Sequence, residues 1–170
     1  MNRLLPAVLA VLAVTAWSSE GWARKTARHK CDVESWVDER LNNWKQQLAR
    51  STPTDPSPIV GTYDRNRGVL LPTCANGPLT TSETITAYFK KFLEDRPVVD
   101  KFEKVSVGGV CGKAFASGLY TFRLDGGSGA TLRARFTYVF QGDVHRAPIM
   151  QHHSSLEPRT QGQQCPAHPD

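Results

Sequence analysis

Apolar residues recur at helical spacing in the first part of the chain. Between residues 31 and 50 they fall three, four and seven positions apart, which predicts one amphipathic helix. The stripe consists of Val33, Trp36, Val37, Leu41, Trp44 and Leu48. Prolines in residues 51–58 end this helix. Ser57 as cap and Pro58 in the first turn then predict a short second helix that reaches about Tyr63.

A third helix is predicted over residues 81–96. Thr81 or Ser82 can cap its start, Glu83 suits the positive end of the helix, and Pro97 ends it. Its apolar stripe is Ile85, Tyr88, Phe89, Phe92 and Leu93. Before this helix, residues 68–73 form a short apolar strand, and the pair at residues 76–77, Asn-Gly, indicates a tight hairpin turn.

After Pro97 the spacing of apolar residues changes from every three or four positions, as in a helix, to every second position, as in a strand. Strands are predicted in residues 98–109, 113–125, 130–142 and 147–157, joined by glycine-rich turns. Pro148 cannot donate a ladder hydrogen bond, so the last strand should begin after it. Helices followed by an antiparallel meander predict an α+β fold, in which helices pack on one side of a curved sheet and a cavity lies between them.

The first residues have the pattern of a secretory signal peptide. Arg3 precedes an apolar run over residues 4–16, and Gly21 and Ala23 form a small-x-small cleavage site. The run is too short to span a bilayer. We therefore predict a signal peptide at 1–23, a basic arm at 24–30, one domain at 31–158 and a polar tail at 159–170, in a secreted or periplasmic protein without a membrane span.

Export affects the interpretation of the four cysteines, because thiols in an oxidising compartment tend to pair. A zinc site made from all four is disfavoured, since no C-x-x-C occurs. Three pairings are open. We expect Cys74 with Cys165 and Cys31 with Cys111, because the last strand should end near residues 68–73.

Composition fits one globular domain, with 39% hydrophobic residues in 170. The formal charge is +5, and much of the excess lies in residues 24–30, as is common for a solvated terminus. No basic stripe with interleaved aromatics occurs in the interior of the sequence, so a nucleic-acid partner is not expected.

The segments "YDRNRGVLLPT", "ITAYFKKFL", "SGLYTF", "RARFTYVF" and "HHSSLEP" resemble the NTF2-like superfamily. The most similar branch is SnoaL-like and related to the association (hub) domain of calcium/calmodulin-dependent protein kinase II, over residues 33–158. The resemblance implies a cone: N-terminal helices packed in a strongly curved antiparallel sheet, mixed at one edge. It also implies a homodimer or larger ring. The hub only oligomerises, whereas similar domains are isomerases, cyclases or dehydratases, so the fold does not decide activity.

Two adjacent histidines follow Gln151 in the last predicted strand. Alternation places His152 with Ser154 on one face and His153 with Ser155 on the other, so the pair cannot share a metal. No metal or cofactor is expected. Residues that could line the cone and bind a small polar or anionic ligand are Tyr63, Tyr88, Tyr120, Arg135 and His153.

Two alternatives to that binding site stay open. In one, Arg133 and Arg135 lie on an outer surface and pair with residues such as Glu103. In the other, the domain is an enzyme with Asp64 or His153 as general base, although Asp64 equally suits a turn carboxylate that bonds local backbone. A purely structural hub, with a cone filled by side chains, is a third possible function.

Overall fold

The structure is a computed structural model, and it describes residues 31–157 except Cys74. The predicted signal peptide, basic arm and C-terminal tail, and the predicted Cys74–Cys165 pair, lie outside the described residues. The described helices and strands, in chain order, are α1 (Val33–Arg50), α2 (Ser57–Val60), β1 (Val69–Leu71), α3 (Ser82–Phe92), the 3₁₀ turn η1 (Leu93–Asp95), β2 (Val98–Val110), β3 (Lys113–Arg123), the 3₁₀ turn η2 (Asp125–Gly127), β4 (Thr131–Gln141) and β5 (Ile149–Leu156).

The first and third helices form as the sequence predicts. Asp32 caps α1 by accepting a hydrogen bond from the Glu34 N–H, and the buried face of α1 carries the predicted stripe. In α3, Thr81 and Thr84 form a reciprocal capping box. The second helix is shorter than expected and ends at Val60. Tyr63 instead forms a parallel bridge with Ile149, which places it beside the start of β5.

One five-stranded sheet has the order β1-β5-β4-β3-β2. All neighbours are antiparallel except β1 and β5, so the sheet is mixed at one edge, as predicted. The strand β5 begins directly after Pro148. Leu70 and Leu79 exchange two backbone hydrogen bonds across the turn that contains residues 76–77, which confirms a return of the chain there.

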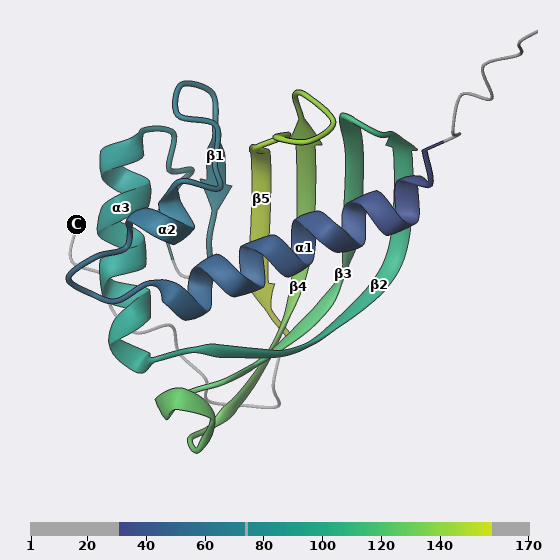
Figure 1. The fold of residues 1–170 in the computed structure, drawn as a ribbon. Coiled ribbons are helices and arrows are strands. Elements are labelled where there is room, and N and C mark those ends of the chain that lie inside the picture. The colour runs from purple at the N-terminus through teal and green to yellow at the C-terminus, as the bar shows by residue number, and fades with distance from the viewer. Residues whose placement is uncertain (1–30, 74, 158–170) are drawn as a thin grey trace, which may run out of the picture. The chain divides into compact units, whose positions relative to one another are not determined.

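The sheet is strongly curved, and α1 lies across its inner face in contact with β2 and β3 (Figure 1). Two register shifts in β2, between Val99 and Lys101 and between Lys104 and Ser106, bend this edge strand. Gly118 lies opposite the second bend, and a Cβ there would stand 2.1 Å from the backbone oxygen of Glu103. The close approach of β2 to β3 therefore requires glycine at this position.

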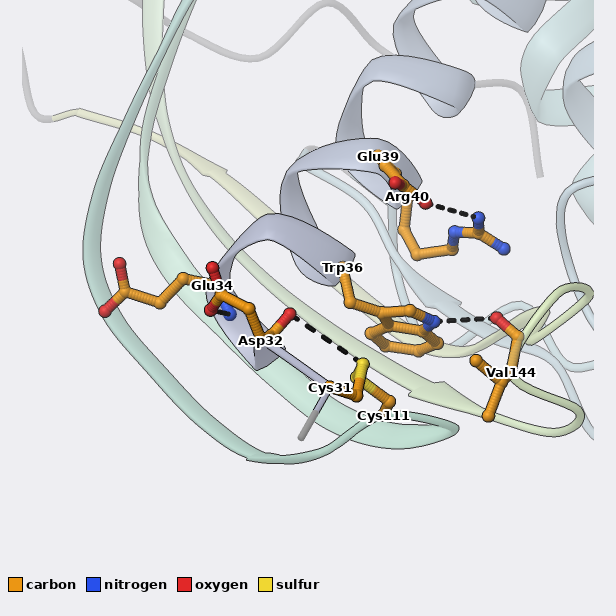
Figure 2. Close-up of a disulfide and its surroundings, with 8 residues drawn as sticks. All are labelled: Cys31, Asp32, Glu34, Trp36, Glu39, Arg40, Cys111 and Val144. Atoms are coloured by element: carbon orange, nitrogen blue, oxygen red, sulfur yellow. Dashed lines mark hydrogen bonds and ion pairs between the residues drawn. A yellow bond between two sulfur atoms is a disulfide. The ribbon is translucent and has the colours of Figure 1, made fainter. Parts of the chain in front are cut away.

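A disulfide between Cys31 and Cys111 joins the start of α1 to the turn between β2 and β3, as predicted (Figure 2). Close by, the indole N–H of Trp36 donates to the backbone oxygen of Val144 at 2.7 Å. The Arg40 guanidinium lies 5.5 Å from the Trp36 ring and donates to the backbone oxygen of His145. These contacts fix the first turns of α1 against the sheet and the β4–β5 loop.

Candidate functional site

The last strand directs His152, and not His153, toward the helices. His152 is 3% exposed and His153 is exposed. Simple alternation from the buried Ile149 would have turned His153 inward. However, Val139 pairs with Gln151 while the next residue, Phe140, pairs with Ile149. Met150 is therefore the extra residue of a bulge, which exchanges the two faces for the rest of β5. The prediction that His153 lines the interior is wrong.

The predicted interior position of Arg135 is also wrong. In β4 the residues Ala134, Phe136, Tyr138 and Phe140 are buried under the helices. Arg133 and Arg135 are on the opposite face and exposed. Arg133 pairs with Glu103 at 2.6 Å, as the alternative interpretation expected. Burial of the aromatic face of β4 leaves the arginine face outside.

Asp64, a candidate base, is a turn carboxylate. Its Oδ1 accepts from the backbone N–H groups of Asn66 and Arg67, and its Oδ2 lies 3.3 Å from the Arg67 guanidinium. Partial burial raises the pKa of this carboxyl, but the three hydrogen bonds outweigh that effect and lower it. With its oxygens engaged in the turn, Asp64 is poorly placed to accept a substrate proton.

His152 lies at the centre of a hydrogen-bonded chain on the inner face. The indole N–H of Trp44 donates to the Tyr63 hydroxyl at 3.4 Å, and the Tyr63 hydroxyl lies 2.7 Å from Nδ1 of His152. Because the Tyr63 oxygen accepts the hydrogen bond from Trp44, its own O–H is free to donate to Nδ1. His152 then carries its proton on Nε2, which lies 3.4 Å from the Tyr120 hydroxyl.

The chain of hydrogen bonds ends at Ser154. The Tyr120 hydroxyl donates to the Ser154 Oγ at 2.5 Å, and Ser154 is only half-buried. The donors therefore run in one direction, from Trp44 through Tyr63, His152 and Tyr120 to a hydroxyl on the partly accessible inner face. We call Trp44, Tyr63, His152, Tyr120 and Ser154 the histidine relay.

Burial keeps the histidine relay uncharged. Desolvation, with a smaller contribution from the neighbouring charge of His153, lowers the pKa of His152 to about 3. Desolvation also raises the pKa of Tyr63, Tyr88 and Tyr120 well above the usual value for tyrosine. Apart from tyrosines and tryptophans, His152 is the one polar side chain that is buried in the described part of the chain. The interior thus offers neutral hydrogen-bonding groups.

Three of the four tyrosines of the chain contact His152: the Tyr63 and Tyr120 hydroxyls lie 2.7 and 3.4 Å from its ring nitrogens, and Tyr138 packs against its ring. Burial raises the pKa of the Tyr138 hydroxyl well above the usual value for tyrosine. The Tyr138 ring stacks on His152 with centroids 4.0 Å apart. The Tyr138 hydroxyl is buried and has no hydrogen-bond partner among the described residues. Such a group costs about 1–3 kcal/mol unless a water or ligand satisfies it.

Half-buried apolar side chains surround the partly accessible end of this cluster. Tyr88 stacks on Phe92 at 5.8 Å, and Phe102 lies 6.1 Å from Tyr120. Leu156 follows on the same face of β5 as Ser154. We call Tyr88, Phe92, Phe102 and Leu156 the apolar rim. Together with Tyr63, Tyr120, Tyr138 and His152 it forms the candidate functional site, which we call the inner-face site.

Three of the five predicted ligand-binding residues, Tyr63, Tyr88 and Tyr120, thus meet in the inner-face site, whereas Arg135 and His153 do not. Sequence reasoning missed His152 and Tyr138. The inward face of β4 was visible from its aromatic alternation, but the bulge that turns His152 toward it was not. Among residues 31–73 and 75–157 no group of three or more His, Cys, Asp or Glu is arranged to hold a metal ion. No described helix is long and apolar enough to cross a membrane.

Solved structures share this fold. A candidate calcium/calmodulin-dependent protein kinase II association domain from Xanthomonas campestris is 29% identical, with a TM-score of 0.62 over 77% of this chain and 96% of that chain. An NTF2-like protein of unknown function from Shewanella oneidensis is 19% identical, with a TM-score of 0.56 over 72% of this chain and 98% of that chain. This chain has the NTF2-like fold.

A third structure, a candidate dehydratase of the NTF2-like family from Streptomyces avermitilis, is 13% identical, with a TM-score of 0.59 over 75% of this chain and 97% of that chain. At this identity the likeness shows the NTF2-like fold alone. No family model and no curated protein matches the sequence. The function of this NTF2-like domain therefore has to be argued from its own residues.

Proposed function

We propose that this NTF2-like domain is an exported, homo-oligomeric binding protein that takes a small uncharged ligand in the inner-face site. The observation that carries the proposal is the gathering of Tyr63, Tyr120 and Tyr138 around His152, with the Tyr138 hydroxyl unpaired among described residues. An apolar rim with a few convergent polar groups is the usual composition of a small-molecule site. The ligand would satisfy the Tyr138 hydroxyl and cover the rim.

The absence of a buried cationic side chain among the described residues favours an uncharged ligand over an anionic one at the inner-face site. Arg135 lies outside, and no described lysine or arginine is buried. A carboxylate at the inner-face site would lose its hydration without a cationic partner, which is costly. An uncharged hydroxyl or carbonyl can instead bond to Tyr138 at little cost.

Catalysis is less well supported than binding. Asp64 is held in its turn, His153 is outside, and both ring nitrogens of His152 face tyrosine hydroxyls. A general base needs a free acceptor within hydrogen-bond reach of its substrate. In the described residues the inner-face site lacks such a group.

Phenol and toluene test the ligand proposal, because they differ only in a hydroxyl or methyl group on the same ring. In titrations followed by NMR, phenol should bind more tightly than toluene by about fivefold, as expected for one net hydrogen bond. Tyr138→Phe should abolish the difference, and His153→Gln on the outer face should leave it unchanged. Equal affinity of the two probes for the unaltered protein would contradict a polar inner-face site.

The outer face of the sheet is the surface that we propose for self-association. Phe115 is 42% exposed in β3, and half-buried Leu119 and Val139 lie on the same face. The similarity to a candidate association domain supports this proposal. Light scattering after size-exclusion chromatography should give a mass of at least two chains, and Phe115→Glu should lower it. A monomer at high concentration would contradict the proposal.

The Cys31–Cys111 disulfide is compatible with an oxidising compartment and supports the proposed export. Cell fractionation followed by N-terminal sequencing tests it. We expect the protein outside the cytoplasm, beginning at Arg24. Protein that is recovered from the cytoplasm and still begins at Met1 would contradict both the export and the cleavage site.

A further inference from the structure

A groove of about 590 Å³ lies between α2 and α3, distinct from the inner-face site. The segment from Thr54 to Arg65 forms one wall, and Ser82, Ile85, Thr86 and Lys90 of α3 form the other. Its volume falls within the range of sites that hold small organic molecules. Tyr63 is shared by the two sites: it is one of the residues that line the groove, and its hydroxyl bonds to His152.

Two cations of the groove have no ion-pair or hydrogen-bond partner for their side chains among residues 31–73 and 75–157. Arg65 and Lys90 both line it, and neither forms an ion pair or side-chain hydrogen bond. Their neighbours in sequence behave differently. Arg67 pairs with Asp64 at 3.3 Å, and Lys91 pairs with Glu94. Arg67 and Lys91 thus each form an ion pair with a carboxylate three positions away. Arg65 and Lys90 form no ion pair with the described residues.

The acidic residue of the groove does not cancel this charge. The Asp64 carboxylate is already engaged by Arg67 and by two backbone N–H groups. Glu83 lies on the exposed side of α3 beside the groove and does not line it. The groove therefore presents a net positive surface between walls that include the apolar side chains of Val60 and Ile85.

We propose that this groove, which we call the α2–α3 groove, is a second binding site that takes a small organic phosphate monoester. A phosphate has three peripheral acceptor oxygens and carries nearly two negative charges. It can therefore engage the planar fork of Arg65 and the ammonium of Lys90 at once. A single carboxylate has only two oxygens, which an arginine fork alone can occupy. The organic part of the ligand lies against Val60 and Ile85.

Phenyl phosphate is the probe, and the experiment uses the full chain at low ionic strength, where exposed charges are least screened. Titration calorimetry with NMR mapping should show binding at residues of the α2–α3 groove. Benzoate should bind more weakly, and phenol should not perturb the groove. Arg65→Gln and Lys90→Gln should each weaken phenyl phosphate binding about fivefold or more, as expected for loss of one charge-assisted hydrogen bond in a partly exposed site.

Matched variants separate a built site from general attraction to a basic protein. Lys91→Gln, beside Lys90, and Arg96→Gln, directly after η1, remove the same kinds of charge from residues that do not line the groove, and each should change the affinity less than twofold. The proposal is overturned if phenyl phosphate does not bind at millimolar concentration or if benzoate binds as tightly. It is also overturned if the two pairs of variants weaken binding equally. Because phenol binding is the test of the inner-face site, failure of one proposal is distinguishable from failure of the other.

Discussion

The Tyr63 hydroxyl lies 2.7 Å from Nδ1 of His152 and joins the segment after α2 to the last strand, across 89 positions of sequence. The contact fixes a neutral histidine in an aromatic core and gives its ring one defined tautomer. It also links the inner-face site to a residue that lines the α2–α3 groove. Several measurable properties of the protein should depend on this pair and on the residues that hold it.

Stability should fall with acid because His152 is buried in its neutral form. Its pKa is about 3 in the folded protein and ordinarily about 6.5 in an unfolded chain. The unfolded state therefore binds the extra proton below pH 6.5, and the free energy of unfolding should fall by up to about 1.4 kcal/mol per pH unit from there toward pH 3. Urea unfolding between pH 7.5 and 5 measures this slope before most carboxylates titrate.

The adjacent histidine provides the control for that slope. His152→Gln should flatten the pH dependence in this window, since glutamine does not titrate. His153→Gln changes an exposed ring on the opposite face and should leave most of the slope in place. The assignment of the slope to His152 fails if His152→Gln unfolds with the same pH dependence as the unaltered protein.

Two tyrosine substitutions of identical chemistry should have different effects on stability. Tyr63→Phe leaves the Trp44 indole N–H and Nδ1 of His152 without their partner, so it should lower the free energy of unfolding by about 1–3 kcal/mol. Tyr138→Phe removes a buried hydroxyl that lacks a partner in the described structure, so without ligand it should be neutral or stabilising. Denaturant titrations of both variants at pH 7.5 test the contrast, and a larger loss for Tyr138→Phe would contradict it.

Removal of the Cys31–Cys111 disulfide should cost a large part of the stability. The bond joins residues 80 positions apart. By restricting the unfolded chain, a cross-link over a loop of that length can raise the free energy of unfolding by at most about 4 kcal/mol. The double variant Cys31→Ala, Cys111→Ala should show this loss in thermal or urea unfolding. A double variant that unfolds at the same urea concentration as the unaltered protein would show that the bond does not stabilise the fold.

Gly118→Ala should destabilise the bent sheet. The added methyl group would lie 2.1 Å from the backbone oxygen of Glu103, so β2 and β3 would have to separate at the bulge. We expect a loss of about 2 kcal/mol or more, comparable to overpacking in a core. Gly77→Ala is the control, because no atom lies within 4 Å of the added group. Similar unfolding curves for the two variants would contradict the steric role of Gly118.

Local patterns in the sequence were sufficient for most of the fold. The stripes of α1 and α3 predict helices because residues three and four positions apart share a helix face. The aromatic alternation of β4 correctly separates Phe136 and Tyr138 from Arg133. Pro148 correctly marks the start of β5. Each of these properties depends on neighbouring residues and is therefore encoded within a few positions of the chain.

The inner-face site depended on longer-range relationships. In β5 the sequence alone established that His152 and His153 point in opposite directions, but not which of them faces the helices. That choice was made by the pairing of Val139 with Gln151 and of Phe140 with Ile149, because a bulge of one residue exchanges the faces of all that follows. The contacts of Tyr63, Tyr120 and Tyr138 with His152, which join four separate segments, likewise exist only when the sheet curves under the helices. The periodicity of apolar residues and the helix caps depend on neighbouring positions in the chain. The register of the strands and the curvature of the sheet result from packing between segments that are distant in sequence.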